Sequence, residues 1–262
     1  VVAMIEGMQP GPVLLLRFDM DALPVNEDTG VEYASQNPGI MHACGHDAHV
    51  AIGLTVARLL SAAREEIHGT VKLIFQPAEE GLGGAERMLA EGILDGPKVD
   101  YALSMHVWNE RPVGWVGVSP GPIMAGAEIF DVTIEGRGGH GALPHTTLDP
   151  VAAAAQVISA LQTIVSRNVS PLDTAVVSVC QVHGGDAFNV IPQSVKLSGT
   201  LRTFRPEVRQ IAVRRFHDLV KGISESMGCR AEVSLKKLTP AVINDEKVTA
   251  LVKQAVAGVF PD

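Results

Sequence analysis

The apolar run VLLLRF, residues 13–18, leads directly into Asp19 and Asp21. Two further apolar runs also end in polar side chains: VKLIF (71–75) comes before Glu79 and Glu80, and YALSM (101–105) comes before His106. Short apolar runs bounded by Gly and Pro predict strands that are buried on both faces of a parallel sheet. Because α/β sheets carry their chemistry beyond the carboxyl ends of such strands, we expect these polar side chains to converge.

Potential metal ligands are concentrated between the first two runs, in the segment MHACGHDAH at residues 41–49, which holds three of the nine histidines. Gly45 allows a tight turn, so that a Cys44 thiolate and a His46 imidazole can face one point, as a first-row metal requires. Alone, the segment fits equally well the start of a helix with a buried, inert cysteine. The acidic and histidine side chains expected at three strand ends favour a metal site.

The composition predicts a soluble globular protein. The chain has 262 residues, of which 46% are hydrophobic, so we expect two domains. No apolar run approaches the roughly 20 residues of a membrane-spanning helix, and no membrane partner is expected. The formal charge is −8 and there is no basic cluster. A nucleic-acid partner is therefore not expected, because such binding depends on neutralising phosphates.

The cysteines suggest a cellular compartment, and the chain ends suggest that the sequence is part of a longer protein. Three cysteines in different contexts, Cys44, Cys180 and Cys229, favour a reducing compartment over a disulfide framework, and we expect a cytoplasmic protein. The first residues lack the features of a signal peptide. They suggest a strand entered in mid-domain, and the last residues suggest a helix without a closing element, so we expect both ends to be cut.

The order of predicted elements divides the chain. Residues 1–126 alternate strands with helices at 50–64 and 84–91, which predicts a mainly parallel sheet with helices on both faces. From Ala127 the predicted order is strand, helix (150–166), strand, strand, helix (206–227), strand, as in a ferredoxin-like sandwich. We therefore expect a first domain of residues 1–126 plus 239–262, with a second domain of residues 127–238 inserted into it.

Seven short motifs follow one another across nearly the whole chain. They are FDMDALP (18–24), MHACGHDAH (41–49), FQPAEEGLGGA (75–85), MHVW (105–108), GRGGHGALPH (136–145), FNVIPQS (188–194) and GTLRTF (199–204). In sequence and in order they resemble the M20 family of metal-dependent amidohydrolases, and within it the group of hippurate hydrolase, N-acyl-amino-acid deacylases and auxin-conjugate hydrolases. The motifs are specific for the family and weak for the substrate.

The resemblance implies an α/β fold, in which a mainly parallel-sheet metallohydrolase domain carries an inserted ferredoxin-like α+β lid and dimerisation domain. It also implies two divalent metal ions in each active site, held by Cys44, His46, Glu80 and His106. This set of donors suits zinc, manganese, nickel or cobalt, and the sequence does not choose among them. Family members have helices before Val1 and a further histidine ligand in a later segment, so the resemblance also implies an incomplete chain.

Glu79 and Glu80 lie where Pro77 and several glycines make the backbone irregular, so their carboxylates can point in different directions. One can hold a metal while the other deprotonates the attacking water, although adjacent glutamates in a loop are more often merely solvated. By resemblance, Glu79 is the general base and Glu80 the ligand. By analogy, Asp21 hydrogen-bonds a metal ligand, and Asp19 either does the same or caps the turn.

Three residues have two interpretations each. Without the resemblance, His140 and His145 would be ordinary turn residues; the resemblance implies that His140 and Asn189 stabilise the oxyanion formed when water attacks an amide carbonyl. Arg202 either grips a substrate carboxylate or makes a structural ion pair. Trp108 lines an acyl pocket or, as is more common near a strand end, packs in the core.

These observations predict a metal-dependent enzyme that hydrolyses the amide bond of N-acyl amino acids, of the N-acetyl, N-benzoyl or indoleacetyl type. The products are a carboxylic acid and a free amino acid. The expected partners are this small-molecule substrate and a second copy of the chain, bound through the lid domain. The alternatives are a dipeptidase or carboxypeptidase of the same fold, and a noncatalytic binding or assembly protein, against which the intact Glu79 and Glu80 pair argues.

Overall fold

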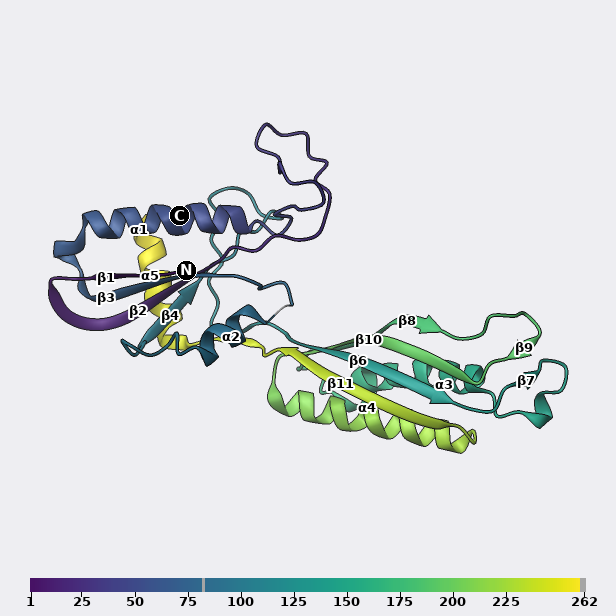
Figure 1. Cartoon of the computed structure of the whole chain (residues 1–262). Helices are drawn as coiled ribbons and strands as arrows, with labels where there is room; N and C mark the ends of the chain where they lie inside the picture. Colours follow the sequence, from purple (N-terminus) through teal and green to yellow (C-terminus); the bar gives the residue numbers. More distant parts are fainter. Residues whose placement is uncertain (82, 260–262) are drawn as a thin grey trace. The chain divides into compact units, whose positions relative to one another are not determined.

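The computed structural model describes residues 1–81 and 83–259, which form two compact units divided between Trp115 and Val116 (Figure 1). The division falls before the boundary expected at residue 126. The assignment of residues 239–262 to the first domain stays a prediction. Within the described residues, no helix combines the length and apolar character needed to cross a membrane.

The first unit is built on one four-stranded sheet. Its strands are β1 (Val2–Glu6), β2 (Gln9–Asp19), β3 (His68–Gln76) and β4 (Tyr101–Ser104), in the order β1-β3-β2-β4. Strand β2 pairs in parallel with both β3 and β4, whereas β1 is antiparallel to β3. The prediction of a mainly parallel sheet is confirmed. Because β2, β3 and β4 run in one direction, their carboxyl ends meet at one edge of the sheet.

Helix α1 (His46–Ala62) lies over the sheet and packs on β2 and β3 (Figure 1). A Cβ atom at Gly53 would lie 2.8 Å from ring carbons of both Phe18 and Phe75, so glycine allows this close approach. The two rings stack with centroids 5.6 Å apart. The helix begins four residues earlier than the expected range of 50–64, so it includes His46, whereas Cys44 and Gly45 lie in the turn just before it. A 3-10 turn (Arg64–Glu66) and helix α2 (Gly84–Ala90) complete the helical elements of this unit.

Strands β3 and β4 of the parallel core differ in burial. Eight of the nine residues of β3 are buried or half-buried, as expected for a strand covered on both faces. In β4, by contrast, three of four residues are exposed, and Tyr101 retains 43% of its surface. The expectation of burial on both faces is therefore wrong for β4, because it pairs only with β2 and lies at the edge of the sheet.

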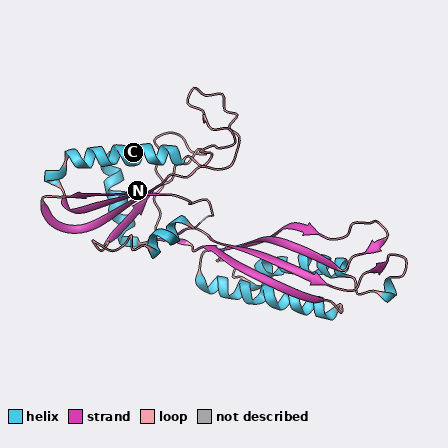
Figure 2. Ribbon diagram, in the orientation of Figure 1, coloured by secondary structure: helices cyan, strands magenta, loops and turns pink. Residues whose placement is uncertain are grey.

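The second unit contains the ferredoxin-like sandwich. Its elements are β6 (Gly126–Glu135), α3 (Pro150–Thr163) with a π-helical continuation (Ile164–Asn168), β8 (Ala175–His183), β10 (Ser194–Thr203), α4 (Pro206–Ser226) and β11 (Arg230–Thr239). The sheet order is β11-β6-β10-β8, and all neighbours are antiparallel. Both helices cover the same face of this sheet (Figure 2). The predicted order of elements is confirmed.

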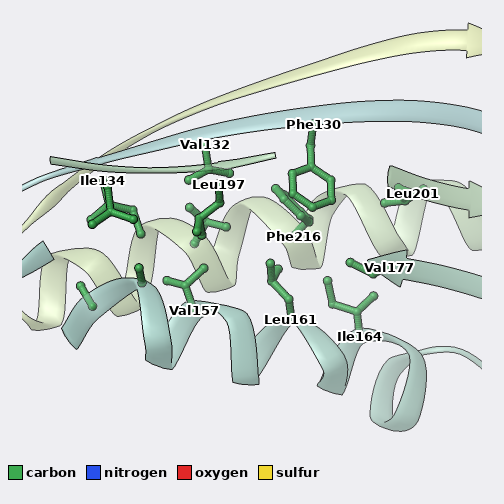
Figure 3. Packing of buried hydrophobic residues seen from close by; sticks show 14 of the residues in the cluster. Phe130, Val132, Ile134, Val157, Leu161, Ile164, Val177, Leu197, Leu201 and Phe216 are labelled. Carbon is green, nitrogen blue, oxygen red and sulfur yellow. The ribbon is translucent and has the colours of Figure 1, made fainter. Parts of the chain in front are cut away.

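Alternation along the strands builds the core of the sandwich. Phe130, Val132 and Ile134 of β6 point towards the helices and are fully buried (Figure 3). The ring of Phe130 packs against that of Phe216 in α4, with centroids 4.6 Å apart. Helix α3 begins with Pro150, and the Asp149 side chain before it accepts hydrogen bonds from two backbone N–H groups of the first turn. Both features are typical of a helix N-terminus.

Short ladders lie at the two ends of the sandwich. Strands β5 (Gly121–Met124) and β12 (Val242–Asn244) pair where the chain enters and leaves it, and helix α5 (Glu246–Val259) follows. At the other end, β7 (Gly139–His140) pairs with β9 (Val190–Ile191). Because β6 and β11 are neighbouring antiparallel strands, the chain enters and leaves the sandwich at the same end.

Candidate metal centre

The strand ends of the first unit bring the predicted ligands together. The ligand atoms of Cys44, His46 and His106 all lie within 4.8 Å of one another, and so do those of His46, Glu79 and Glu80. His46 belongs to both groups, which makes it the centre of the cluster. Of the implied ligands, the structure thus gathers Cys44, His46, Glu80 and His106.

Gly45 shapes the turn that presents Cys44 and His46. It adopts a left-handed φ of 81° at the N-terminus of α1, a conformation that side chains disfavour. A Cβ atom here would also lie 2.6 Å from a methyl group of Val107. Both the backbone angle and the packing therefore require glycine between the two ligands.

His46 has the hydrogen bonding of a metal ligand. Its ring is 1% exposed, and its Nδ1 lies 3.0 Å from the carbonyl oxygen of Asp21, to which it donates. The proton on Nδ1 leaves a lone pair on Nε2, and within the described residues this buried atom has no hydrogen-bond partner. An unsatisfied buried polar group costs about 1–3 kcal/mol. A divalent cation at Nε2 would satisfy it, so the residues fit a metal.

His106 is oriented in the same way. Its Nδ1 donates to the carbonyl of Val107 at 2.6 Å, and its Nε2 lies 3.4 Å from the sulfur of Cys44. Metal-binding histidines commonly donate their second ring nitrogen to a carbonyl or carboxylate, which fixes the tautomer. His46 and His106 share this arrangement: each donates from Nδ1 to a carbonyl, which leaves Nε2 of His106 beside Cys44 and Nε2 of His46 3.6 Å from Oδ2 of Asp19.

The surroundings of Cys44 disfavour its thiolate form. Burial raises the pKa of this thiol to about 11, and the nearby carboxylates of Glu80 and Glu79 add to the effect. The same negative field attracts a divalent cation, which would deprotonate the sulfur on binding. Thiolate, imidazole and carboxylate donors together suit first-row metals.

Asp21 joins two of the predicted ligands. Its Oδ2 accepts a hydrogen bond from the backbone N–H of Glu80 at 3.0 Å, and its Oδ1 lies 3.3 Å from Nδ1 of His46. Burial disfavours the charged carboxylate, but hydrogen bonds from the backbone of Glu80 and Glu79 outweigh burial and lower the pKa of Asp21. This geometry supports the role expected for Asp21 beside the ligands.

Asp19 and His49 form a buried pair to which the sequence assigned no firm role. Each is 1% exposed, and Nδ1 of His49 donates to the Asp19 carboxylate. Asp19 also accepts from Arg17 at 2.6 Å. Burial opposes its ionisation, but His49 and the charges of Arg17 and His46 keep the pKa of Asp19 below its usual value. The missed signal was the spacing of His46 and His49, which share one face of a helix three residues apart.

Trp108 does not pack in a core. Its side chain is 52% exposed, and its ring meets that of His106 edge to face, with centroids 6.5 Å apart. The more common interpretation, core packing, is therefore wrong here. The reason is that the residues after the edge strand β4 remain at the surface.

The predicted oxyanion residues lie in the second unit. His140 pairs with Val190 in the β7–β9 ladder, and the backbone N–H of Gly141 donates to the carbonyl of Asn189 at 2.8 Å. The ladder thus brings His140 and Asn189 together at one end of the sandwich, where both are exposed.

Arg202 lies elsewhere in the same unit. It faces Ala127 across the β10–β6 pairing, at the end of the sheet opposite to the β7–β9 ladder. The side chain is exposed, and no ion pair to it occurs within the described residues. The structural ion pair considered for Arg202 is therefore not formed among them.

The family model for peptidase families M20, M25 and M40 matches residues 15–262. The chain belongs to the M20 family. The resemblance noted in the seven sequence motifs is thus confirmed, and the two M20 domains implied by it correspond to the parallel sheet and the ferredoxin-like sandwich described above.

Two curated M20 relatives and one solved structure give the extent of the similarity. An N-acetyl-L-cysteine deacetylase from Bacillus subtilis is 46% identical over 97% of this chain. An N-acyl-L-amino acid amidohydrolase from Geobacillus stearothermophilus is 46% identical over 88% of it. The chain spans only 61% and 62% of these relatives. A crystal structure of a dinuclear metal-binding M20 peptidase from Bacillus subtilis is 39% identical, with a TM-score of 0.84 over 98% of this chain and 66% of that one.

Proposed function

We propose that this chain is part of a metal-dependent amidohydrolase that cleaves the amide bond of N-acyl amino acids. The observation that carries the proposal is His46: its buried Nε2 lacks a hydrogen-bond partner within the described residues, and its ring lies among the ligand atoms of Cys44, His106, Glu79 and Glu80. The names of the two curated relatives support an N-acyl amino acid as substrate. The free thiol among the ligands fits a reducing compartment, and we propose the cytoplasm.

Two divalent metal ions fit this site, and Cys44, His46, Glu80 and His106 would hold them. Zinc, manganese, nickel and cobalt are all compatible with these donors. When bound, such ions polarise the substrate carbonyl and lower the pKa of a coordinated water. The dinuclear relative of known structure supports the number of two.

Glu79 would serve as the general base. The two carboxylates of the pair differ in burial: Glu79 is exposed, whereas Glu80 is half-buried. Ala78 before them has a positive φ of 56°, so the chain turns sharply where β3 ends. Glu79 can therefore take a proton from the attacking water and pass it to the departing amine, while Glu80 stays in the cluster.

His140 and Asn189 would stabilise the oxyanion. The backbone N–H of Ala142 donates to Nδ1 of His140 at 3.1 Å. In the neutral ring the proton must then lie on Nε2, which makes this atom a hydrogen-bond donor. A donor is what a developing oxyanion requires. The local hydrogen bond thus supports the role proposed for His140.

The active enzyme would be a homodimer formed through the sandwich. His140 follows the far end of β6, and the ten residues of this strand place it roughly 30 Å from the point where the chain enters the sandwich. Strand β8 forms an edge of the sheet and exposes Val176 and Val182. Such an edge can pair with a second copy, which would bring His140 to the partner's active site.

Arg202 would bind the substrate carboxylate. It is exposed and makes no ion pair among the described residues, so its guanidinium group can form bidentate hydrogen bonds to a ligand. Because Arg202 lies at the entry end of the sandwich and His140 at the other end, one sandwich cannot present both to the same small substrate. This separation also favours a site completed by two copies.

A substrate screen on the full-length protein tests the proposal. The full-length protein, loaded with zinc, manganese, nickel or cobalt in turn, should release the free amino acid from N-acetyl, N-benzoyl or indoleacetyl amino acids. The Glu79→Gln variant should not. Dipeptides and peptides with a free carboxyl terminus form the second arm, because one structural relative is a peptidase. Preference for these substrates would replace the proposed substrate class. If the protein has full metal occupancy and acts on neither class of substrate, the proposal that it is an enzyme is wrong.

A further inference from the structure

We propose that His49 is a positioning residue that orients His106 through the backbone N–H and carbonyl groups of Val107. The proposal rests on the role proposed above for His106 as a metal ligand. His49 lies on α1, whereas Val107 lies on the segment after β4, so the contact joins two separate parts of the first unit.

The backbone N–H and the carbonyl of Val107 connect the two histidines. Its backbone N–H donates to Nε2 of His49 at 2.9 Å. Its carbonyl accepts from Nδ1 of His106 at 2.6 Å. His49 therefore holds the residue that orients the His106 ring. The His49 and His106 rings also meet edge to face, with centroids 4.7 Å apart, so the contact is direct as well.

The hydrogen bonds of His49 distinguish it from the ligands. The ligand atoms of Asp19, His46 and His49 lie within 4.8 Å of one another, and spacing alone would allow a metal among them. However, Nδ1 of His49 donates to Asp19 and Nε2 accepts from Val107, so both nitrogens are engaged. Nε2 of His46, in contrast, has no hydrogen-bond partner among the described residues, and Nε2 of His106 lies beside the sulfur of Cys44. The three histidines thus share one tautomer but have two roles.

Asp19 anchors His49 to the sheet. Arg17 donates to Asp19 through Nη1 at 2.6 Å and to Gln76, the last residue of β3, through Nε at 2.8 Å. The chain of contacts therefore runs from the ends of β2 and β3, through Asp19 and His49, to Val107. Because His49 is 1% exposed, water does not replace its hydrogen bonds. Loss of this chain should let the His106 segment move relative to Cys44.

Zinc and cobalt binding by the full-length protein test the proposal. His49→Phe keeps a ring against His106 but removes both hydrogen bonds, and it should weaken metal binding about 10- to 100-fold in chelator competition, as is typical when the partner of a ligand is lost. His49→Gln keeps an amide that can donate to Asp19 and accept from Val107, so it should recover part of the affinity. In the Co²⁺ form, His49→Phe should also shift the absorption bands of the metal.

Val71→Ala is the matched control, because Val71 is buried in the core of the same unit and takes no part in these hydrogen bonds. It should lower the melting temperature without changing the absorption bands. If Val71→Ala and His49→Phe weaken metal binding equally at matched stability, His49 acts through general stability and the proposal is wrong.

His106→Ala distinguishes this proposal from the proposal that His106 is a metal ligand, on which it rests. If His106→Ala loses metal but His49→Phe binds like the wild type, His106 remains a ligand and the positioning role fails alone. If His106→Ala binds metal normally, both proposals fail. Should His49→Phe not fold, ¹⁵N spectra of the wild type still decide: they must show His49 protonated on Nδ1 and accepting at Nε2, and a proton on Nε2 would overturn the proposal.

Discussion

Asp21 accepts the backbone N–H of Glu80 at 3.0 Å with one carboxylate oxygen, while its carbonyl accepts from His46. One residue thus aligns two proposed ligands that come from different elements, the turn after β3 and the start of α1. The positions of Glu80 and His46 are therefore coupled before any cation arrives. Preorganisation of this kind raises metal affinity, because the ligands need not be ordered on binding.

We expect Asp21→Ala to lower metal affinity about 10- to 100-fold, because it frees the Glu80 backbone and removes the carboxylate beside Nδ1 of His46. The measurement is chelator competition with the full-length protein. Asp28→Ala is the control, since Asp28 lies exposed in the loop after β2. Equal affinities in the two variants would show that Asp21 does not organise the site.

Acid should destabilise the metal-free protein through Asp19. Its pKa in the folded protein is below the ordinary value of 3.8, because the hydrogen bond from His49 and the charge of Arg17 outweigh burial. A carboxylate with a lowered pKa stabilises the fold above its ordinary pKa, and this contribution is lost as the pH falls through the lowered value. Urea unfolding should therefore show the free energy of unfolding decreasing below pH 3.8, and decreasing less steeply in Asp19→Asn than in Asp28→Asn.

Cys44 should react slowly in the metal-free protein. With a pKa of about 11, its thiolate fraction at pH 8 is about a hundredth of that of a cysteine at the ordinary value of 9.0. Cys180 is exposed and provides an internal comparison for alkylation measured by mass spectrometry. In the metal-binding assay, Cys44→Ser should lose occupancy and Cys180→Ser should not. Full occupancy in Cys44→Ser would remove Cys44 from the ligand set.

Glu79→Gln should abolish turnover and leave the bound metal unchanged. The amide keeps the shape of the side chain but cannot take a proton from water, and general-base catalysis is worth about a hundred- to ten-thousandfold. Glu80→Gln should instead reduce metal occupancy, because Glu80 is the half-buried member in the cluster. If Glu79→Gln retained more than about a tenth of the wild-type rate, the assignment of the base would be wrong.

Periodicity and strand ends predicted much of this fold and of its site. The succession of predicted strands and helices from Ala127 onward was sufficient for the ferredoxin-like order. The apolar runs of β2 and β3 located Asp21 and Glu80, because parallel strands end at one edge of a sheet. Apolar runs and the order of strands and helices can be recognised from neighbouring residues alone.

The features that sequence analysis missed depend on single contacts between distant segments. The tight turn at Gly45 was predicted, but its close packing against Val107, 62 residues later in the chain, was not, and neither was the start of α1 at His46. Because the predicted helix began at residue 50, His49 lay outside it, and its contact with Asp19 was not predicted. The exposure of Tyr101 likewise depends on which strands pair with β4, a property of the sheet rather than of the run YALSM.

Complementation between two inactive variants tests the proposed dimer. His140→Ala removes an oxyanion donor, worth about 3 kcal/mol in comparable sites, and Glu79→Gln removes the base. If each active site combines the Glu79 of one copy with the His140 of the other, a mixed dimer contains one intact site. Random exchange makes half of the dimers mixed, so activity should return to about a quarter of the wild-type level. Mass spectrometry must show the mixed dimers, and activity that stays at the level of the separate variants in their presence would place His140 outside the partner's site.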